Sequence, residues 1–145
     1  MKVVYNALKL SEHRSLFHDL RVLVIGVGAV GTHLMEKFAK MGLSPDAIDF
    51  DFFTPENAAK HSCLVRTPED VGRNKAECSS ERVRPLLDDG CSSNGIDAEL
   101  CKLGPEAFSD YDYVVAAVDN FDAKVLLNEL IRQLPKERRP IIIMD

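Results

Sequence analysis

The sequence predicts an α/β fold, in which an open, mostly parallel sheet carries helices on both faces. Short apolar segments typical of buried strands alternate with segments in which apolar residues recur every three or four positions, as in amphipathic helices. One strand, Arg21–Ile25, also ends in a glycine-rich turn that leads directly into a helical pattern. Strands alternating with helices pack as a layered sheet with helical crossovers.

The first half of the chain contains the clearest strand and helix. Residues 11–20 read as a short helix that leads into Arg21–Ile25, a nearly continuous apolar run expected of a central parallel strand. A helix follows Gly28 and ends at Gly42, a common helix stop. Residues 46–50 form the second predicted strand. The apolar face predicted for the helix consists of Val30, Leu34, Phe38 and Met41.

The second half repeats the alternation after a polar connection at residues 54–68. Residues 96–103 alternate in polarity like a strand, residues 113–118 form a buried apolar strand, and residues 140–144 open one more buried strand. A helix over residues 73–87 places Ala76, Ser80, Val83 and Leu87 on one side. A last amphipathic helix is marked by Ala123, Leu127, Leu130 and Leu134.

The composition is that of a water-soluble, cytoplasmic protein. The 145 residues suit one domain, and the hydrophobic content of 46% with 28% charged residues is ordinary for a globular chain. The formal charge of −5 argues against nonspecific nucleic-acid binding and against binding to anionic membranes, which both need a basic patch. No apolar run approaches the ~18 residues of a membrane span, and the four cysteines lack the spacing of a metal site or a disulfide framework.

Three glycines at G-x-G-x-x-G spacing follow the strand Arg21–Ile25, as in Rossmann-like nucleotide-binding domains. Gly26 would make the tight turn, Gly28 would let the backbone approach a phosphate, and Gly31 would let the helix pack closely on the strand. The helix N-terminus offers N–H groups and partial positive charge to an anion. Asp49 stands where a second strand should end, the usual place for a carboxylate that binds ribose hydroxyls. The alternative is a glycine-rich turn without a ligand.

Ligands of such sheets bind beyond the carboxyl ends of the strands. Gly26, Asp49 and Asp119 each follow a predicted strand. The sequence therefore predicts that they meet in one crevice.

Four further motifs follow the glycine turn in a fixed order. The chain reads Asp49-Phe-Asp51, then Asn57-Ala-Ala-Lys60, then Gly72-Arg-Asn-Lys75, then Asp119-Asn120. This order resembles the ThiF/MoeB/HesA superfamily, whose members activate ubiquitin-like proteins and sulfur carriers. The family pattern is a glycine loop, D-x-D, N-x-x-R, G-x-x-K opening a helix, and D-N at a strand end. The resemblance runs from about Arg21 to the last residue.

The resemblance implies an ATP-dependent adenylation that uses Mg²⁺. A C-terminal carboxylate attacks the α-phosphate, pyrophosphate leaves, and charge neutralisation matters more than acid–base chemistry. By the family pattern, Asp49 would hold the ribose, and Asn57 and Lys60 would contact phosphates. Lys75 would stabilise charge at the reacting phosphate, and Asp119 would ligate Mg²⁺. The implied catalytic residues are Lys75, Lys60 and Asp119, and the implied nucleotide-binding residues are Gly26, Gly28, Gly31, Asp49, Asp51, Asn57, Lys60, Lys75 and Asn120.

The resemblance also implies partners. The substrate would be a ubiquitin-like or sulfur-carrier protein, and family members are commonly dimers in which one subunit completes the site of the other. Residues 1–145 would be a single nucleotide-binding domain, the N-terminal part of a longer activating-enzyme domain whose remainder carries the catalytic cysteine. We therefore expect nucleotide binding without pyrophosphate exchange, and an apolar surface at Ile141–Met144.

Two departures from the family pattern keep other interpretations open. Lys60 replaces the arginine of N-x-x-R, and Lys124 replaces an arginine usual after D-N, so the planar fork that suits phosphate is lost. An inert nucleotide-binding or protein-binding module is therefore one alternative. An NAD-dependent oxidoreductase is another, although it gives Asn57, Lys60 and Lys75 no role. Residue by residue, the lysines could be surface lysines, and Asp119 and Asn57 could cap helices.

Overall fold

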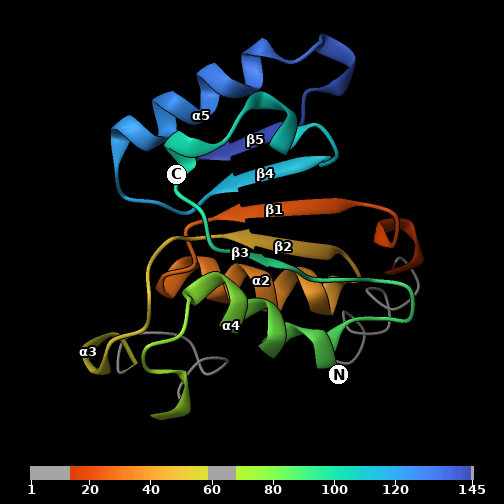
Figure 1. Ribbon diagram of the computed structural model, residues 1–145. Coiled ribbons are helices and arrows are strands. Elements are labelled where there is room, and N and C mark those ends of the chain that lie inside the picture. Colours follow the sequence, from red (N-terminus) through yellow and green to blue (C-terminus); the bar gives the residue numbers. More distant parts are fainter. Residues whose placement is uncertain (1–13, 59–67, 145) are drawn as a thin grey trace, which may run out of the picture.

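One sheet of five parallel strands forms the centre of the molecule (Figure 1). The structure, a computed structural model, describes residues 14–58 and 68–144. The strand order is β3-β2-β1-β4-β5, and every neighbouring pair is parallel. The strands are β1 (Arg21–Ile25), β2 (Ser44–Ile48), β3 (Gly95–Ile96), β4 (Tyr113–Ala116) and β5 (Ile141–Met144). The predicted open parallel sheet is thus confirmed.

Helices cover both faces of the sheet, as predicted (Figure 1). Helices α2 (Ala29–Met41) and α4 (Lys75–Val83) pack on one face, and α5 (Phe121–Gln133) packs on the other. A single turn, α3 (Pro55–Ala58), lies in the connection after β2. Short 3-10 segments complete the described chain: η1 (Arg14–Phe17), η2 (Pro68–Asp70), η3 (Arg84–Leu86), η4 (Leu100–Lys102), η5 (Pro105–Phe108) and η6 (Lys136–Arg138).

Strand β1 lies between two hydrophobic cores. Val22 and Val24 pack with α2 and α4, whereas Leu23 and Ile25 pack with α5, because successive side chains of a strand point to opposite faces. The two cores bury all four side chains almost completely. A strand covered on both faces needs an unbroken apolar run, which is why the sequence predicted β1 with its observed bounds.

Strand β2 begins two residues earlier than predicted, at Ser44 instead of residue 46. Its first residues are polar, but Asp46 is buried and fully paired. Its carboxylate accepts hydrogen bonds from Arg21 Nη2 (2.9 Å), from the Tyr111 hydroxyl (2.8 Å) and from the Asn94 backbone N–H (2.7 Å). A buried carboxylate with such partners is compatible with a strand inside the sheet. A hydrophobicity pattern does not reveal that the carboxylate is paired.

The strand predicted over residues 96–103 is wrong beyond its first residue. Strand β3 pairs with β2 only at Gly95 and Ile96, because β2 itself ends at Ile48. The chain then leaves the sheet and forms the turn η4. The alternating apolar residues are still used, since Ala98, Leu100 and Leu103 pack against the core under α5.

The helices differ from prediction mainly in their faces and ends. Of the predicted apolar face of α2, Leu34, Phe38 and Met41 pack, partly buried, against the core, whereas Val30 is 57% exposed. The fully buried positions of the helix are Gly31, Thr32, Met35, Glu36 and Ala39. The stop at Gly42 is confirmed, with a left-handed φ of 88°. Helix α4 starts at Lys75 rather than residue 73 and passes into η3 after Val83. Of the helix predicted at 11–20, residues 11–13 lie outside the described residues, and only Arg14–Phe17 of the remainder is helical, as the turn η1.

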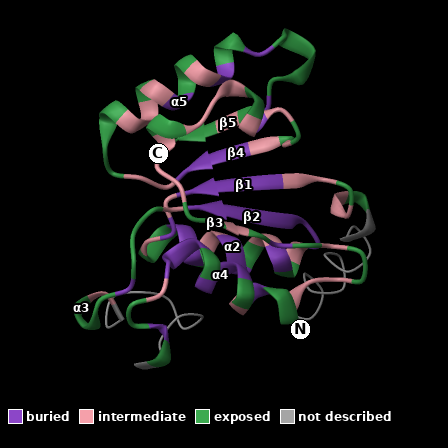
Figure 2. Ribbon diagram, viewed as in Figure 1, coloured by how far each residue is buried: buried purple, intermediate pink, exposed green. Residues whose placement is uncertain are grey.

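Strand β5 is exposed, although a buried strand was predicted. It forms the edge of the sheet, and Ile141 and Ile143 are 59% and 48% exposed. Figure 2 shows the contrast with the buried central strands. The apolar surface expected at Ile141–Met144 is present. Within the described ranges, none of the helices is long and apolar enough to cross a bilayer.

Candidate functional site

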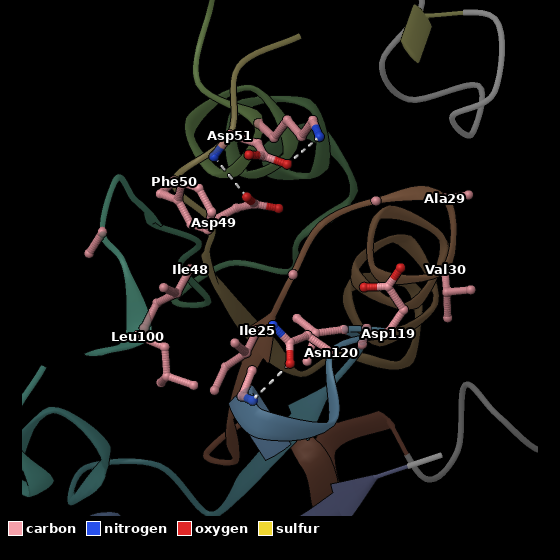
Figure 3. Close-up of a pocket in the computed structure, with 17 residues that line it drawn as sticks. Ile25, Ala29, Val30, Ile48, Asp49, Phe50, Asp51, Leu100, Asp119 and Asn120 are labelled. Atoms are coloured by element: carbon pink, nitrogen blue, oxygen red, sulfur yellow. Dashed lines mark hydrogen bonds and ion pairs between the residues drawn. The ribbon is translucent and has the colours of Figure 1, made fainter. Parts of the chain in front are cut away.

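A pocket of about 480 Å³ lies at the carboxyl ends of β1, β2 and β4 (Figure 3). This volume is in the range of small-molecule sites. The glycine turn, the loop after β2, the start of α4 and the loop after β4 surround it. Its lining consists of Ile25, Gly26, Gly28, Ala29, Val30, Ile48, Asp49, Phe50, Asp51, Lys75, Ala98, Leu100, Ala117, Val118, Asp119, Asn120 and Ala123. The structure therefore brings Gly26, Asp49 and Asp119 into one crevice.

The glycine turn requires glycine at two positions for different reasons. Gly26 has a φ of +83°, and a Cβ there would lie 2.6 Å from Val118 Cγ1. A Cβ at Gly31 would overlap the carbonyl oxygen of Gly26, so Gly31 lets α2 pack against the turn instead of lining the pocket. The expected role of Gly28, close approach to a phosphate, stays a prediction.

Helix α2 points its N-terminus at the pocket. Gly28 is its N-cap, and no side chain of the described residues caps it. Ala29 and Val30, in the first turn, line the pocket. The first N–H groups of a helix lack partners within the helix and carry partial positive charge, so this end of the pocket suits an anion.

Asp49 joins the loop after β2 to the glycine turn. Its Oδ2 accepts a hydrogen bond from the Val27 N–H (2.8 Å), and its Oδ1 accepts one from the Asp51 N–H (2.9 Å). Each carboxylate oxygen has two lone pairs, so Asp49 keeps capacity to accept from hydroxyl groups of a ligand. The residue predicted to bind ribose is thus held in place before any ligand arrives.

Lys75 reaches the pocket from the first turn of α4 and forms an ion pair with Asp51. Lys75 Nζ lies 2.9 Å from Asp51 Oδ2, and the lysine side chain is only 9% exposed, whereas Asp51 is 52% exposed. A nearly buried ammonium requires a charged or hydrogen-bonding partner. Asp51 provides that partner, and a phosphate entering the pocket would offer a second one. These contacts make Lys75 a buried pocket residue rather than a solvated surface lysine.

Asn74 is part of the site although the sequence analysis assigned it no role. It is the N-cap of α4, and its Oδ1 accepts from the backbone N–H groups of Ala76 and Glu77. Its Nδ2 donates to the backbone carbonyls of Asp49 (2.9 Å) and Asp51 (3.3 Å). An asparagine directly before a helical pattern is a cap signal that would have identified the first of these two functions.

Asp119 and Asn120 are adjacent but have different roles. Asn120 caps α5, since its Oδ1 accepts from the Asp122 N–H at 2.9 Å and the Ala123 N–H at 3.4 Å. The alternative that Asp119 caps this helix is therefore wrong. Asp119 is exposed and lines both the pocket and an adjoining hollow of about 260 Å³ that includes Val30 and Lys124.

Besides Gly31, two predicted residues are not placed in the pocket. Asn57 lies within the turn α3 and is absent from the described residues that line the pocket. Its backbone N–H donates to Thr54 Oγ1 (3.3 Å), so Thr54 rather than Asn57 occupies the capping position of this turn. Lys60 lies outside the described residues, and its phosphate contact stays a prediction.

The donor set fits a magnesium ion that is bound together with phosphates. Mg²⁺ commonly takes one or two carboxylates, several waters and phosphate oxygens, and the exposed Asp119 near the N-terminus of α2 offers one such carboxylate. In the part of the chain that the structure describes, no three His, Cys, Asp or Glu side chains form a closed metal site. A metal held by protein ligands alone is thus not supported there.

The pocket has chemically distinct sides (Figure 3). Ile48, Phe50 and Leu100 form an apolar wall on one side, and Ala29, Val30 and Asp119 lie on the other. Phe50 is 56% exposed, so its ring is available to a flat apolar group. An apolar wall, a carboxylate beside it and a positive end with Lys75 suit the base, sugar and phosphates of a nucleotide.

Comparison of the sequence with known proteins finds a matching family model and several similar proteins. The ThiF family model matches residues 6–139. The chain is 30% identical over 122 residues to ubiquitin-activating enzyme E1 1 of Candida albicans, covering 76% of this chain and 12% of that protein. It is 35% identical over 112 residues to tRNA threonylcarbamoyladenosine dehydratase of Haemophilus influenzae, covering 73% of this chain and 41% of that protein.

Solved structures show the same fold. Crystal structures of Escherichia coli tRNA N6-threonylcarbamoyladenosine dehydratase superpose with a TM-score of 0.74 at 24% identity. One of them is a complex with ATP. The match covers 96% of this chain and 57% of the dehydratase chain. The chain thus spans only part of the proteins that it matches.

Proposed function

Because this chain belongs to the ThiF family, we propose that it binds ATP and serves the adenylation of the C-terminal carboxylate of a ubiquitin-like or sulfur-carrier protein. The observation that supports this most is the pocket itself. It combines Asp49, Lys75, Asp119 and the N-terminus of α2 around one volume. An oxidoreductase would need no buried lysine at this place, and the relatives named above are a ubiquitin-activating enzyme and two tRNA threonylcarbamoyladenosine dehydratases.

The proposed reaction is a displacement at phosphorus. A carboxylate oxygen of the substrate bonds to the α-phosphorus, the bond from that phosphorus to the oxygen bridging the β-phosphate breaks, and pyrophosphate leaves with the electron pair. No proton has to move, so the protein contributes positioning and charge. Asp49 accepts from the ribose hydroxyls, Lys75 and the α2 N-terminus face the phosphates, and Asp119 holds Mg²⁺, which neutralises triphosphate charge.

Several parts of this proposal rest on the resemblance to the family. These are phosphate contacts by Asn57 and Lys60, nucleotide contacts by Asp51 and Asn120, a homodimer, a cytoplasmic location, and a position in the N-terminal part of a longer activating-enzyme domain. Asn57 would have to approach the phosphates from α3, which does not line the pocket.

A second candidate is activation of a small carboxylate or of a modified tRNA base. Two dehydratases that act on a tRNA nucleoside are among the relatives, and the similar solved structures are of such an enzyme. Both candidates use the same ATP pocket. In the longer activating-enzyme domain proposed above, pyrophosphate exchange that depends on a carrier protein would support the first, and exchange that depends on modified tRNA would support the second.

Calorimetric titration of the 145-residue chain tests the nucleotide site. We expect it to bind Mg-ATP, to bind ATP less tightly with EDTA, and to bind NAD poorly. Lys75→Met removes the ammonium while keeping the apolar stem, and we expect ATP affinity to fall by about tenfold or more, the scale of a charge-assisted hydrogen bond. Lys37→Met on the exposed side of α2 is the matched control.

Two results would contradict the proposal. One is binding of NAD that is tighter than binding of Mg-ATP. The other is equal ATP affinity of the wild type and Lys75→Met.

A further inference from the structure

We propose that Asn74 is a positioning residue of the nucleotide site, which fixes Asp49 relative to Lys75 through its side-chain amide. This inference rests on the function proposed above, because it concerns the same pocket. Asn74 itself does not line the pocket and is 2% exposed, so it acts only through its neighbours.

Backbone hydrogen bonds already join the loop after β2 to the segment before α4. The Phe53 N–H donates to the Arg73 carbonyl (2.9 Å), and the Lys75 N–H donates to the Asp51 carbonyl (2.8 Å). Phe52 and Asn74 face each other as an antiparallel bridge between these bonds. Together with the ion pair between Lys75 and Asp51, this pairing holds Lys75 firmly. This backbone pairing ends at Asp51. The ribose-binding candidate Asp49 accepts from the Asp51 N–H (2.9 Å) and donates its own N–H to the Ile96 carbonyl (3.2 Å), but neither contact is made by α4.

The amide of Asn74 extends this connection to Asp49. Its Nδ2 donates to the Asp49 carbonyl (2.9 Å), and its Oδ1 accepts from the Ala76 N–H at the start of α4 (2.8 Å). One rigid, planar group thus connects the residue that carries the carboxylate to the helix that carries the lysine. The Asn74 side chain needs both a donor and an acceptor for this, and asparagine provides one at each end of its amide.

The geometry separates positioning from capping. Serine is about as good an N-cap as asparagine, so Asn74→Ser keeps an acceptor for α4. Its hydroxyl is too short to reach the Asp49 carbonyl as well. The variant therefore removes the link to Asp49, adds no charge, and leaves the backbone pairing that holds Lys75. The expected defect lies at the ribose and not at the phosphates.

The test compares three probes on the 145-residue chain with Mg²⁺: ATP, 2′,3′-dideoxy-ATP and inorganic triphosphate. We expect the wild type to prefer ATP over the dideoxy compound. Asn74→Ser should lose most of that preference, with ATP affinity falling about tenfold. Its affinity for triphosphate should change less than twofold. Asn128→Ser, an exposed change on α5, should behave like the wild type.

Helix content and thermal unfolding show whether Asn74→Ser is folded. If Asn74→Ser does not fold, Asn74→Asp is measured instead. Aspartate keeps the side-chain size and the capping oxygen but cannot donate to the Asp49 carbonyl. The affinity of this variant for triphosphate corrects for the added negative charge. A folded variant that keeps the wild-type preference for ATP overturns the proposal and leaves Asn74 as a cap. A wild type that binds ATP without discriminating the ribose also overturns it. A wild type that binds no ATP overturns the proposed function itself.

Discussion

At the scale of single residues, the end of β4 shows how neighbouring polar side chains take different tasks. Asn120 Oδ1 accepts hydrogen bonds from two N–H groups of α5, and the adjacent Asp119 carboxylate is exposed in the pocket. The sequence placed both residues after β4 correctly, although the strand ends at Ala116 and not at the predicted residue 118. It could not separate their tasks, because Asp and Asn are equally good caps and only backbone direction decides which one turns towards the helix.

Asp119→Asn should abolish the dependence of ATP binding on Mg²⁺ without unfolding the protein. The substitution keeps the side-chain size and leaves the Asn120 cap intact, but it removes the charge that the metal needs. The measurement is ATP affinity with Mg²⁺ and with EDTA, which should become equal. Asp122→Asn, in the exposed first turn of α5, removes the same charge and should keep the metal dependence. Metal dependence that survives in Asp119→Asn would contradict the assignment.

Cys78 should be almost inert towards thiol reagents. It is fully buried against Phe53, and burial raises the pKa of its thiol to about 11. The thiolate is the reactive form, so between pH 7 and 9 Cys78 stays protonated and shielded, whereas Cys101 is exposed to the reagent. Alkylation with iodoacetamide, followed by mass spectrometry of each site, should label Cys101 long before Cys78. Unfolding in guanidinium should remove the difference, and equal rates in the native protein would refute the prediction.

At the scale of elements, sequence pattern and structure agree where one physical requirement dominates. Strand β1 had to be apolar on both sides, and its bounds were predicted without error. Strand β2 spans Ser44–Ile48 instead of residues 46–50, because Ser44 and Pro45, which show no strand pattern, pair with Arg21 and Val22 of β1. The segment after Ile96 was mistaken for a strand because its apolar residues Ala98, Leu100 and Leu103 do pack against the core, although they do so from a loop and a turn. In each case the extent of the strand depends on contacts with residues that are distant in the sequence.

Gly31→Ala tests whether helix propensity or close packing governs the start of α2. Propensity alone would make alanine about 1 kcal/mol more stable than glycine inside a helix. The added Cβ would overlap the Gly26 carbonyl oxygen, so we expect a net loss of about 1–3 kcal/mol in the free energy of unfolding. Urea unfolding measures the change. His33→Ala, an exposed position on the same helix, should stay within about 0.5 kcal/mol, and a stabilised Gly31→Ala would disprove the packing argument.

At the scale of the whole molecule, the polar residues of the pocket lie at the carboxyl ends of the strands, and an exposed apolar surface lies at the edge of the sheet formed by β5. Ile143 of β5 lines an apolar hollow of about 180 Å³ with Phe17, Leu20 and Phe38, on the face that carries α2. The sequence predicted an apolar surface at Ile141–Met144 but not that this strand lies at the edge of the sheet, since strand order cannot be deduced from the order of elements along the chain. Exposed apolar patches and unpaired strand edges favour association.

Ile143→Lys should reduce self-association of the 145-residue chain. A lysine on an edge strand opposes edge-to-edge pairing and adds charge to the apolar hollow. Light scattering as a function of concentration should show a smaller apparent mass than for the wild type. Val71→Lys adds the same charge at a 39% exposed site remote from β5 and should leave the mass unchanged. A wild type that stays monomeric at all concentrations would contradict the prediction.

The contacts of the Asp49 carboxylate have a consequence for exchange of backbone protons with solvent. One carboxylate holds the Val27 N–H of the glycine turn and the Asp51 N–H of the loop after β2. A hydrogen-bonded amide exchanges only during excursions that break its bond. Movement of Asp49 breaks both bonds at once, so these two amides should exchange in the same opening events although they are distant in sequence. The glycine turn and the loop after β2 are therefore expected to open as one cooperative unit.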